Sequence, residues 1–312
     1  MIYFITPAEG VFPGINRLFK ETIKVVGGEH IFLNDLHKIT KNDVAIFGAW
    51  SPIYSTAIRR CKAKKKIIHW ASPLLQAELA GVEVDYLTMT LQLLEKNIIQ
   101  GLWVIDADNY EVLKERKGVF HTPTPFSVER LKSYRKKAED KEGVCFFTVF
   151  HNKQKNVLAQ LAGTYLAQKK HDFALFTNGL TPQQKYFTDA IRLNYRDLGF
   201  LPWDDYFEWL SSAKLLLQVS VSEAFSYIAA ESLAMGTPTL MSQVVADNMG
   251  VSEEKVIASD ISSPVEISLL IRAILELDEK EYNKLCDNCI SGIERTSEEN
   301  NDKVKKTFMK LK

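Results

Sequence analysis

The sequence predicts an α/β protein built from two doubly wound parallel sheets, and three observations support this fold class. Short apolar runs of strand length alternate with helical stretches along most of the 312 residues. A highly charged stretch, 127–143, interrupts this alternation near the middle of the chain. Beyond it, the window 215–242 reads strand, loop, helix and strand. This order is typical of parallel strands that are joined through helices.

The first half of the chain supplies one set of alternating elements. Strands are expected at Ile2–Ile5, Val44–Phe47, Lys66–Trp70, Leu102–Ile105 and Val119–His121. Helices are expected at Ile15–Val26, Ser55–Lys62 and Leu87–Ile99. Because strands and helices alternate, we predict a Rossmann-like domain over residues 1–135.

The stretch 127–143 carries almost no large apolar residue after Leu131, so it is predicted to be a linker. Beyond it, the segments VCFFTVF, DFALFTN, KLLLQV and PTLMS supply a second set of strands. Helices are expected between them at Val157–Lys169, Gln183–Arg196 and Asp205–Ser211. A second Rossmann-like domain is therefore predicted over residues 143–296.

The composition narrows the class of partner. Lys plus Arg and Asp plus Glu each number 39, so no excess of positive charge favours nucleic acid. No apolar run approaches the roughly 20 residues of a membrane span, and the leading MIYFI is too short for a signal peptide. We therefore expect a cytoplasmic protein whose partner is a small molecule or a glycan.

The cysteines include one C-x-x-C pair, Cys286 and Cys289. The pair lies in a charged, helix-like stretch and has no second ligand pair in the sequence. Zinc or redox chemistry usually requires such a partner pair or a characteristic structural context. We therefore interpret the two thiols as neighbours on one helix face.

The window 215–242 contains two acidic residues in unusual settings. Leu215–Val219 has the length of a buried strand, and Gly236 followed by Pro238 ends the helix that comes after it. The loop between them carries Glu223 and should open at the carboxyl edge of the sheet. Ligands of open α/β sheets bind at this edge, where the N-terminal amides of helices attract anions.

The second acidic residue, Glu231, is the only charged residue between Ala224 and Met235. A buried carboxylate requires polar partners, and side chains on a helix lean toward its N-terminus. Glu231 should therefore reach toward the same crevice as Glu223. Taken alone, two acids at this spacing are most often solvated surface groups.

The sequence around the two acids, SVSEAFSYIAAESLAMGTPTLMS, resembles the donor-sugar motif of retaining glycosyltransferases with the GT-B fold, especially glycosyltransferase family 4. The positions that match the motif are Ser220, Glu223, Phe225, Glu231, Gly236 and Pro238. Ala224 and Ser226 stand where the family usually has small glycines.

The resemblance implies two Rossmann-like domains that face each other across a cleft, with the tail 297–312 returning to the first domain. It implies that Glu223 acts on the donor sugar and that Glu231 holds the ribose of the nucleotide. Loop and helix amides would take the pyrophosphate, and Ser220, Phe225 and Ser226 are further candidates for binding the donor. The donor would be a nucleoside diphosphate sugar, with UDP or GDP favoured, and transfer would occur with retention and without a metal or a further cofactor.

A second segment, FFTVFHNKQKN, stands where the family has an Arg and a Lys that neutralise the donor phosphates. Lys155 matches the Lys, whereas Phe150 or His151 occupies the place of the Arg. Lys153 and His151 are the candidates to replace it. A solvated lysine remains the alternative for Lys155, which would otherwise act as a point charge on the diphosphate.

The nucleobase side of the site is suggested by two further segments. LFTNG, which ends at Gly179, resembles the family's second strand and glycine. LGFLPWDDYFEWLSSAK resembles the segment beside the base, where backbone groups of Phe200 and Leu201 would make contact. Because backbone contacts leave little trace in side chains, the identity of the base stays open.

In the first domain, Pro13 and Gly14 stand for the family's glycine loop, and Gly14 would let the backbone approach a donor phosphate. An ordinary strand-to-helix turn is the alternative. His69 ends a strand near the place of a cleft histidine that contacts the donor sugar in the family, and His121 is a weaker candidate. A structural histidine is the alternative for both.

The basic run Arg59–Lys66 offers a peripheral membrane contact for a lipid-linked acceptor, with a solvated helix end as the alternative. The acceptor could equally be a glycan or a small molecule. Two other functions remain open. The chain could be a non-catalytic GT-B-like subunit that binds a nucleotide sugar or serves as a scaffold, or an unrelated two-domain Rossmann-like binding protein in which Glu231 faces solvent.

Overall fold

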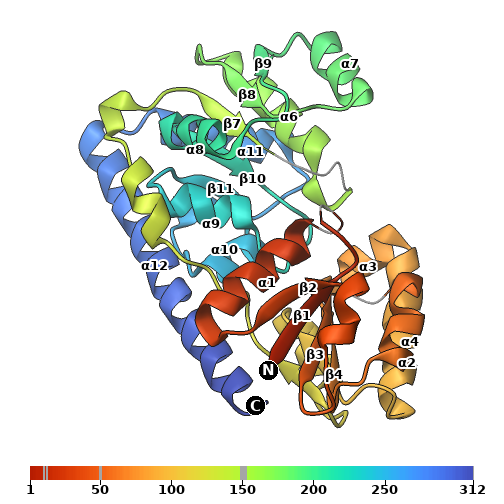
Figure 1. The fold of residues 1–312 in the computed structure, drawn as a ribbon. Helices are drawn as coiled ribbons and strands as arrows, with labels where there is room; N and C mark the ends of the chain where they lie inside the picture. Colours follow the sequence, from red (N-terminus) through yellow and green to blue (C-terminus); the bar gives the residue numbers. More distant parts are fainter. Residues whose placement is uncertain (10, 12, 49–50, 148–152, 312) are drawn as a thin grey trace. The chain divides into compact units, whose positions relative to one another are not determined.

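The computed structural model describes residues 1–9, 11, 13–48, 51–147 and 153–311, which form two compact units. Unit 1 comprises Met1–Ser127 with Ser297–Lys312, and unit 2 comprises Val128–Thr296. The boundary therefore lies before the expected domain end at residue 135. Each unit contains one six-stranded sheet with helices against it (Figure 1).

The sheet of unit 1 is parallel throughout, in the order β2-β1-β3-β4-β5-β6. Its strands are β1 (Ile2–Thr6), β2 (Glu29–Phe32), β3 (Val44–Gly48), β4 (Lys65–Trp70), β5 (Gly101–Val104) and β6 (Val119–His121). The five expected strands are confirmed with shifts of one residue at most at their ends. The strand β2 was not expected, because its four residues include the polar Glu29 and His30.

The described part of unit 1 contains the helices α1 (Pro13–Val26), α2 (Ser55–Arg60), α3 (Leu74–Ala80), α4 (Val82–Glu95) and α5 (Ala107–Leu113). Helices α3 and α5 were not expected from the sequence. The expected helix Leu87–Ile99 is wrong at both ends. It begins at Val82 and ends at Glu95, because Asn97 adopts a left-handed conformation (φ 54°) that an α-helix cannot continue through.

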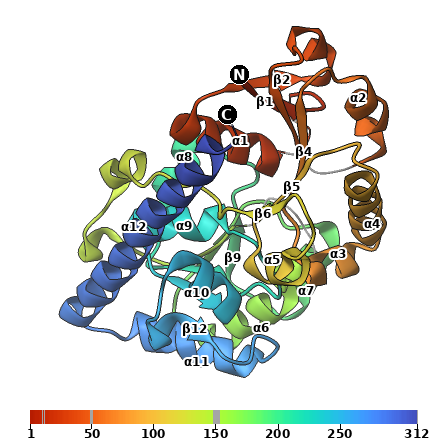
Figure 2. The same cartoon turned by 90° about the horizontal axis from the view of Figure 1, so that it is seen from below.

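Side chains alternate between the two faces of this sheet, as the pleat requires. On one face, Phe4 and Trp103 pack against Phe19 of α1 and against Phe308 near the C-terminus. On the other, Ile68 belongs to the cluster beneath α2, α3 and α4. Figures 1 and 2 show α1 on one side of this sheet and α2 and α4 on the other.

The sheet of unit 2 is also parallel, in the order β12-β11-β10-β7-β8-β9. Its strands are β7 (Val144–Phe146), β8 (Leu175–Thr177), β9 (Tyr195–Asp197), β10 (Leu215–Gln218), β11 (Thr239–Ser242) and β12 (Ile257–Ala258). The four expected strand segments are confirmed. The expected helix Gln183–Arg196 is wrong in its second half, because the chain turns at the left-handed Arg192 (φ 58°) and then pairs with β8 as β9.

Seven helices begin in the described part of unit 2. They are α6 (Val157–Gln168), α7 (Pro182–Ala190), α8 (Trp203–Ser212), α9 (Tyr227–Ala234), α10 (Gln243–Met249), α11 (Pro264–Leu275) and α12 (Glu279–Met309). Helices α6 and α11 pack closely, since a Cβ atom on Gly163 would lie 2.6 Å from Cγ2 of Ile267. Glycine is therefore required at position 163 for this approach.

The helix α12 is continuous over 31 residues and contributes to both units. Within unit 1, Oγ of Ser297 donates to the carbonyl oxygen of Phe126 at 2.5 Å. Nδ2 of Asn300 donates to the carbonyl oxygen of Thr124 at 3.0 Å. These bonds fix the second half of the helix to the end of the first unit's main chain, so the stretch 297–312 groups with unit 1.

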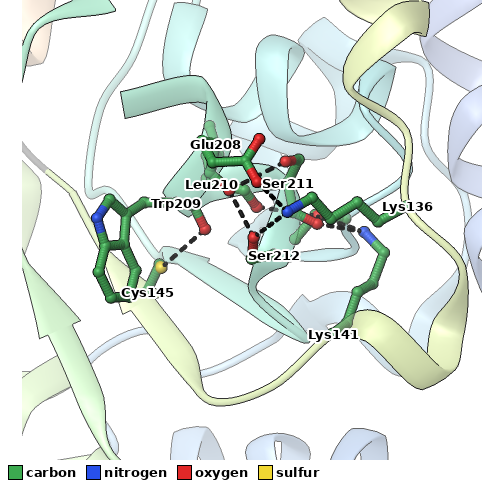
Figure 3. Close-up of polar contacts among 9 residues, drawn as sticks. Lys136, Lys141, Cys145, Glu208, Trp209, Leu210, Ser211 and Ser212 are labelled. Atoms are coloured by element: carbon green, nitrogen blue, oxygen red, sulfur yellow. Dashed lines mark hydrogen bonds and ion pairs between the residues drawn. The ribbon is translucent and has the colours of Figure 1, made fainter. Parts of the chain in front are cut away.

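The charged stretch 127–143 is not a free linker, because residues 128–143 belong to unit 2. Nζ of Lys141 donates to the carbonyl oxygen of Ser211 at 2.9 Å and to Oγ1 of Thr237 at 2.8 Å. Lys136 pairs with Glu208, which lies on α8 one turn before Ser211 (Figure 3). Desolvation lowers the pKa of Lys141 to about 8. The charge pattern indicated solvent, whereas this lysine is buried against the end of α8.

Candidate functional site

The site forms where two loops meet at the carboxyl edge of the sheet in unit 2. Lys155 ends the 3₁₀ turn η5 (Lys153–Lys155) between β7 and α6, and Glu223 lies in the loop between β10 and α9. Because β7 and β10 are paired neighbours, both loops leave the same edge. Their side chains form an ion pair in which each is 14% exposed.

Main-chain and side-chain bonds hold these two loops together. The amide of Val221 donates to the carbonyl oxygen of Gln154 at 2.7 Å. The amide of Val219 donates to Oε1 of Gln160 at 2.9 Å, and Nε2 of Gln160 donates to the carbonyl oxygen of Lys155 at 2.7 Å. Sequence reasoning missed Gln160, although a glutamine amid the apolar residues of VLAQLAGTYLA is an available signal.

Glu231 lies on α9 and is only 1% exposed. The hydroxyl of Tyr206, on α8, donates to Oε2 of Glu231 at 2.8 Å. The burial expected for this carboxylate is therefore confirmed, and it contradicts the solvent-facing position required by the unrelated-binding-protein alternative. Tyr206 was not singled out from the sequence, because its partner is 25 residues away along the chain.

The other residues of the donor motif build the turn that leads into α9. Oγ of Ser226 accepts from the amide of Ala229 at 3.3 Å and caps the helix. Oγ of Ser220 accepts from Nε2 of Gln218 at 3.0 Å. Phe225 lies edge-on against Tyr227, with 5.2 Å between the ring centroids. The first amides of a helix have no partner within the helix, so this end of α9 suits an anion.

The expected base side of the site lies at the carboxyl ends of β8 and β9. Asp197, which the sequence did not single out, accepts at Oδ1 from the amide of Gly179 at 2.6 Å. Burial opposes its ionisation, but hydrogen bonds from Lys185 and Gly179 outweigh burial and lower the pKa of this carboxyl. Leu201 follows β9 in the loop before α8 and is partly exposed. Asp197 thus fixes the loop that carries Gly179.

The candidates in unit 1 lie in contrasting settings. Gly14 is the second residue of α1, and apart from its chain neighbours and the nearby backbone of its own helix no described atom lies within 4 Å of the place where its Cβ would be. His69 is fully buried on β4, with its ring centroid 4.5 Å from that of Trp103 and 5.8 Å from that of Phe19. Neither ring nitrogen has a hydrogen-bond partner among the described residues.

Desolvation lowers the pKa of His69 to about 3, so its imidazole is neutral at physiological pH. This enclosure favours the structural alternative over a contact with the donor sugar. His121 is likewise accounted for within unit 1: its Nε2 lies 3.2 Å from the carbonyl oxygen of Ile105, and its ring stacks on Tyr110.

Two other candidates cannot be placed in the same way. Phe150 and His151, which stand in place of the family's phosphate Arg, lie outside the described residues. Lys153 is described and is exposed at the start of η5. Of the candidate cations that the structure describes here, Lys155 is the one paired with Glu223.

The thiols of Cys286 and Cys289 are free and buried on α12. Burial raises the pKa of Cys286 to about 11 and also raises that of Cys289, so both thiols are protonated at neutral pH. In the described part of the chain, no three His, Cys, Asp or Glu residues gather as a metal site.

The basic run Arg59–Lys66 spans the end of α2 and the start of β4. It therefore lies toward the amino edge of the sheet in unit 1, away from the carboxyl edge where ligands of such sheets bind. Nζ of Lys66 donates to the carbonyl oxygen of Ile58 at 3.3 Å. No helix within the described ranges has the length and apolar character needed to cross a bilayer.

Comparison with solved structures identifies the architecture. The UDP-forming α,α-trehalose-phosphate synthase of Burkholderia xenovorans, solved with glucose-6-phosphate, matches with a TM-score of 0.74 at 9% identity over 99% of each chain. HepE of Anabaena, solved with UDP and glucose, matches with a TM-score of 0.73 at 12% identity over 99% of this chain and 98% of that one.

TarM of S. aureus matches with a TM-score of 0.69 at 12% identity, over 89% of this chain and 57% of that one. No protein-family model matches the sequence, and no relative is found among curated proteins. The matched structures are GT-B proteins, so the chain has the GT-B fold, and the expected resemblance is confirmed at the level of the fold.

Proposed function

We propose that this chain is a glycosyltransferase that moves a sugar from a nucleoside diphosphate sugar to an acceptor. The observation that carries the proposal is the meeting of Lys155 and Glu223 beside the N-terminus of α9. A cation, a carboxylate and a helix N-terminus together offer partners for a diphosphate and for sugar hydroxyls.

Each residue then has a distinct task in the proposal. Lys155 stabilises the negative charge of the diphosphate, which grows as the diphosphate leaves. Lys153 supplies a second positive charge on the same 3₁₀ turn. Glu223 exchanges its ion pair for hydroxyls of the donor sugar. Glu231, oriented by Tyr206, accepts from the ribose hydroxyls.

Backbone groups complete the proposed donor site. The turn formed by Ser220, Phe225 and Ser226 presents amides to the pyrophosphate. Gly179 and Leu201 border the nucleobase in this proposal. His69 keeps only the structural role that its burial supports.

The donor class and the stereochemistry belong to the same proposal. UDP is present in the structure of HepE from Anabaena. UDP-2-fluoro glucose is bound in another structure that matches this chain, described as trehalose-6-phosphate from E. coli. We therefore favour a UDP-sugar, with a GDP-sugar as the next choice. Retention and independence from a metal follow from the resemblance of the donor motif. In this scheme the acceptor attacks on the face from which the diphosphate departs.

The acceptor, a glycan, a lipid-linked molecule or a small molecule, would bind to unit 1. A cytoplasmic location and a peripheral membrane contact through Arg59–Lys66 are part of the same proposal. The amino-edge position of the run means that a membrane bound there would not meet the carboxyl edge of that sheet.

The test begins with nucleotide binding. The purified chain should be stabilised against thermal unfolding by one of UDP, GDP or ADP or by their sugar conjugates, because a ligand that binds only the folded state raises apparent stability. Glu223→Gln should keep the affinity for the nucleoside diphosphate. It should abolish both the transfer of the sugar and the slow hydrolysis of the donor by water.

The outcomes separate the two candidate functions. Donor binding without transfer or hydrolysis in the unchanged chain would indicate the non-catalytic binding or scaffolding subunit. Failure to bind any of these nucleotides would remove the proposed function altogether.

A further inference from the structure

We infer that Gln160 is a positioning residue that fixes Lys155 opposite Glu223. The inference rests on the proposed function, because the two charged residues are the proposed partners of the donor. Gln160 lies in the first half of α6, outside every motif that the sequence singled out. It contacts neither charged side chain through a bond that the structure records, so it acts through the main chain.

The side-chain amide of Gln160 joins the two loops of the site. Its Oε1 accepts from the amide of Val219, at the carboxyl end of β10, at 2.9 Å. Its Nε2 donates to the carbonyl oxygens of Lys155 at 2.7 Å and of Asn156 at 3.3 Å. One neutral side chain therefore binds the loop that carries the cation and the strand that leads to the carboxylate.

The burial of Gln160 makes these bonds hard to replace. The residue is 1% exposed, so water cannot readily take the place of a lost partner. A buried polar group without a partner costs more free energy than a hydrogen bond usually contributes. Removing the amide would leave the Val219 amide and the Lys155 carbonyl to find new partners, and the two loops would shift.

The turn at Asn156 explains why Lys155 needs this support. Asn156 adopts a left-handed conformation (φ 50°), and its Nδ2 donates to the carbonyl oxygen of Ile261 at 2.5 Å. The chain thus changes direction sharply between η5 and α6, immediately after Lys155. Gln160 bonds to the carbonyl groups on both sides of this change and so determines where the lysine side chain begins.

Positioning matters because lysine is a long, flexible point charge. A lysine that is already oriented loses less conformational freedom when the diphosphate binds, and this saving appears as affinity. Gln160 should therefore affect the affinity for the diphosphate and leave contacts with the base and the ribose unchanged.

The experiment compares Gln160→Met with the unchanged chain by calorimetry, using whichever of UDP, GDP and ADP binds, together with the matching nucleoside. We expect an approximately tenfold weaker affinity for the diphosphate, because a lysine that is no longer oriented must lose its conformational freedom on binding, and an unchanged affinity for the nucleoside. In a Lys155→Met chain, adding Gln160→Met should change the affinity by less than about twofold, because the two residues act as one unit.

Gln168→Met is a matched control on the same helix. Nε2 of Gln168 donates to the carbonyl oxygens of Phe173 at 3.0 Å and Asn194 at 2.8 Å, and its Oε1 accepts from the amide of Asn194 at 2.9 Å. These bonds lie at the opposite end of α6 from Lys155. The control should lower the melting temperature without changing the affinity for the diphosphate.

Gln160→Glu covers the case in which Gln160→Met does not fold. It keeps an acceptor for the Val219 amide but loses the donor to Lys155, so it should also weaken diphosphate binding. Full diphosphate affinity in a folded Gln160 variant, or an equal loss in Gln168→Met, would overturn the inference.

A ligand-free measurement separates this inference from the proposed function. If the unchanged chain binds no nucleotide, the proposed function fails first. Hydrogen exchange at the amides of Val219 and Val221 still reports on the link between the loops. Faster exchange in Gln160→Met than in Gln168→Met supports the positioning role, and equal exchange contradicts it.

Discussion

The ion pair between Lys155 and Glu223 joins residues that are 68 positions apart in the chain. It forms because β7 and β10 lie side by side in the sheet, so that the loops that follow them meet. In the absence of a donor each charge is the other's partner. In the proposed function, a donor that binds here exchanges these contacts.

Lys155→Met should weaken binding of the nucleoside diphosphate. A hydrogen bond to a charged group contributes about 1.5–3 kcal/mol, which corresponds to about a tenfold to hundredfold loss of affinity. Titration calorimetry measures the change. Lys153→Met, on the exposed start of the same 3₁₀ turn, should have the smaller effect. An equal effect of the two changes would assign the phosphate contact to the turn as a whole.

Glu231→Gln should reduce the preference for ribose over deoxyribose. The carboxylate is a stronger acceptor than the amide, and Tyr206 already holds it in place. We expect the unchanged chain to bind the ribonucleoside diphosphate about tenfold more tightly than its 2′-deoxy form. The variant should show a clearly smaller difference between the two forms, because the amide oxygen of glutamine is the weaker acceptor.

Glu294→Gln controls for the loss of a carboxylate elsewhere in unit 2, where Glu294 pairs with Arg135. It should leave the preference for ribose intact. If Glu231→Gln also leaves it intact, Glu231 is a structural partner of Tyr206 and does not contact the ribose.

Lys141→Met should change how stability depends on alkaline pH. Burial lowers the pKa of Lys141 from 10.5 to about 8 in the folded chain, so between these values the unfolded state binds more protons. The folded state with lysine therefore gains stability as pH rises from about 8 to 10.5, by on the order of 3 kcal/mol relative to the variant.

Denaturant unfolding of both chains at pH 7.5 and pH 10 measures this difference. Groups other than Lys141 titrate in both chains and cancel in the comparison. A difference between the chains that is independent of pH would show that the lysine is not desolvated as its contacts with Ser211 and Thr237 indicate.

Phe308→Ala should destabilise unit 1 by about 3–5 kcal/mol, the usual cost of removing a buried aromatic ring. Phe308 is fully buried, with its ring centroid 5.0 Å from that of Trp103 and 6.0 Å from that of Phe4. Urea unfolding followed by tryptophan fluorescence measures the loss. Met309→Ala, on the next and exposed residue, should have little effect. Similar stability in both variants would mean that the end of α12 adds nothing to unit 1.

Sequence reasoning succeeded where one segment carries its own signal. The window 215–242 was predicted to be strand, loop, helix and strand, and the structure has β10, a loop, α9 and β11 there. Its apolar strands and the stop at Gly236 are local features. The burial of Glu231 was also predictable, because a single charge within an apolar helix can be read from neighbouring residues.

Predictions failed where distant residues decide the outcome. Charged residues in 127–143 indicated a linker, yet α8 and Thr237 supply partners that bury Lys141. The helix expected through Arg196 stops at Ala190, because β8 offers a paired edge to the residues that follow. Gln160 belongs to no recognisable motif, because its role depends on a hydrogen bond with the amide of Val219, 59 residues away in the chain.

The sequence by itself determined the α/β class, most of the strands and the two acids of the donor motif, because periodicity and motif spacing are properties of adjacent residues. Only the tertiary structure decided that Lys155 meets Glu223, that Tyr206 holds Glu231 and that His69 is enclosed. The physical reason is that strand order in a parallel sheet determines which loops become neighbours. The order β10-β7-β8 is not the order of those strands along the chain.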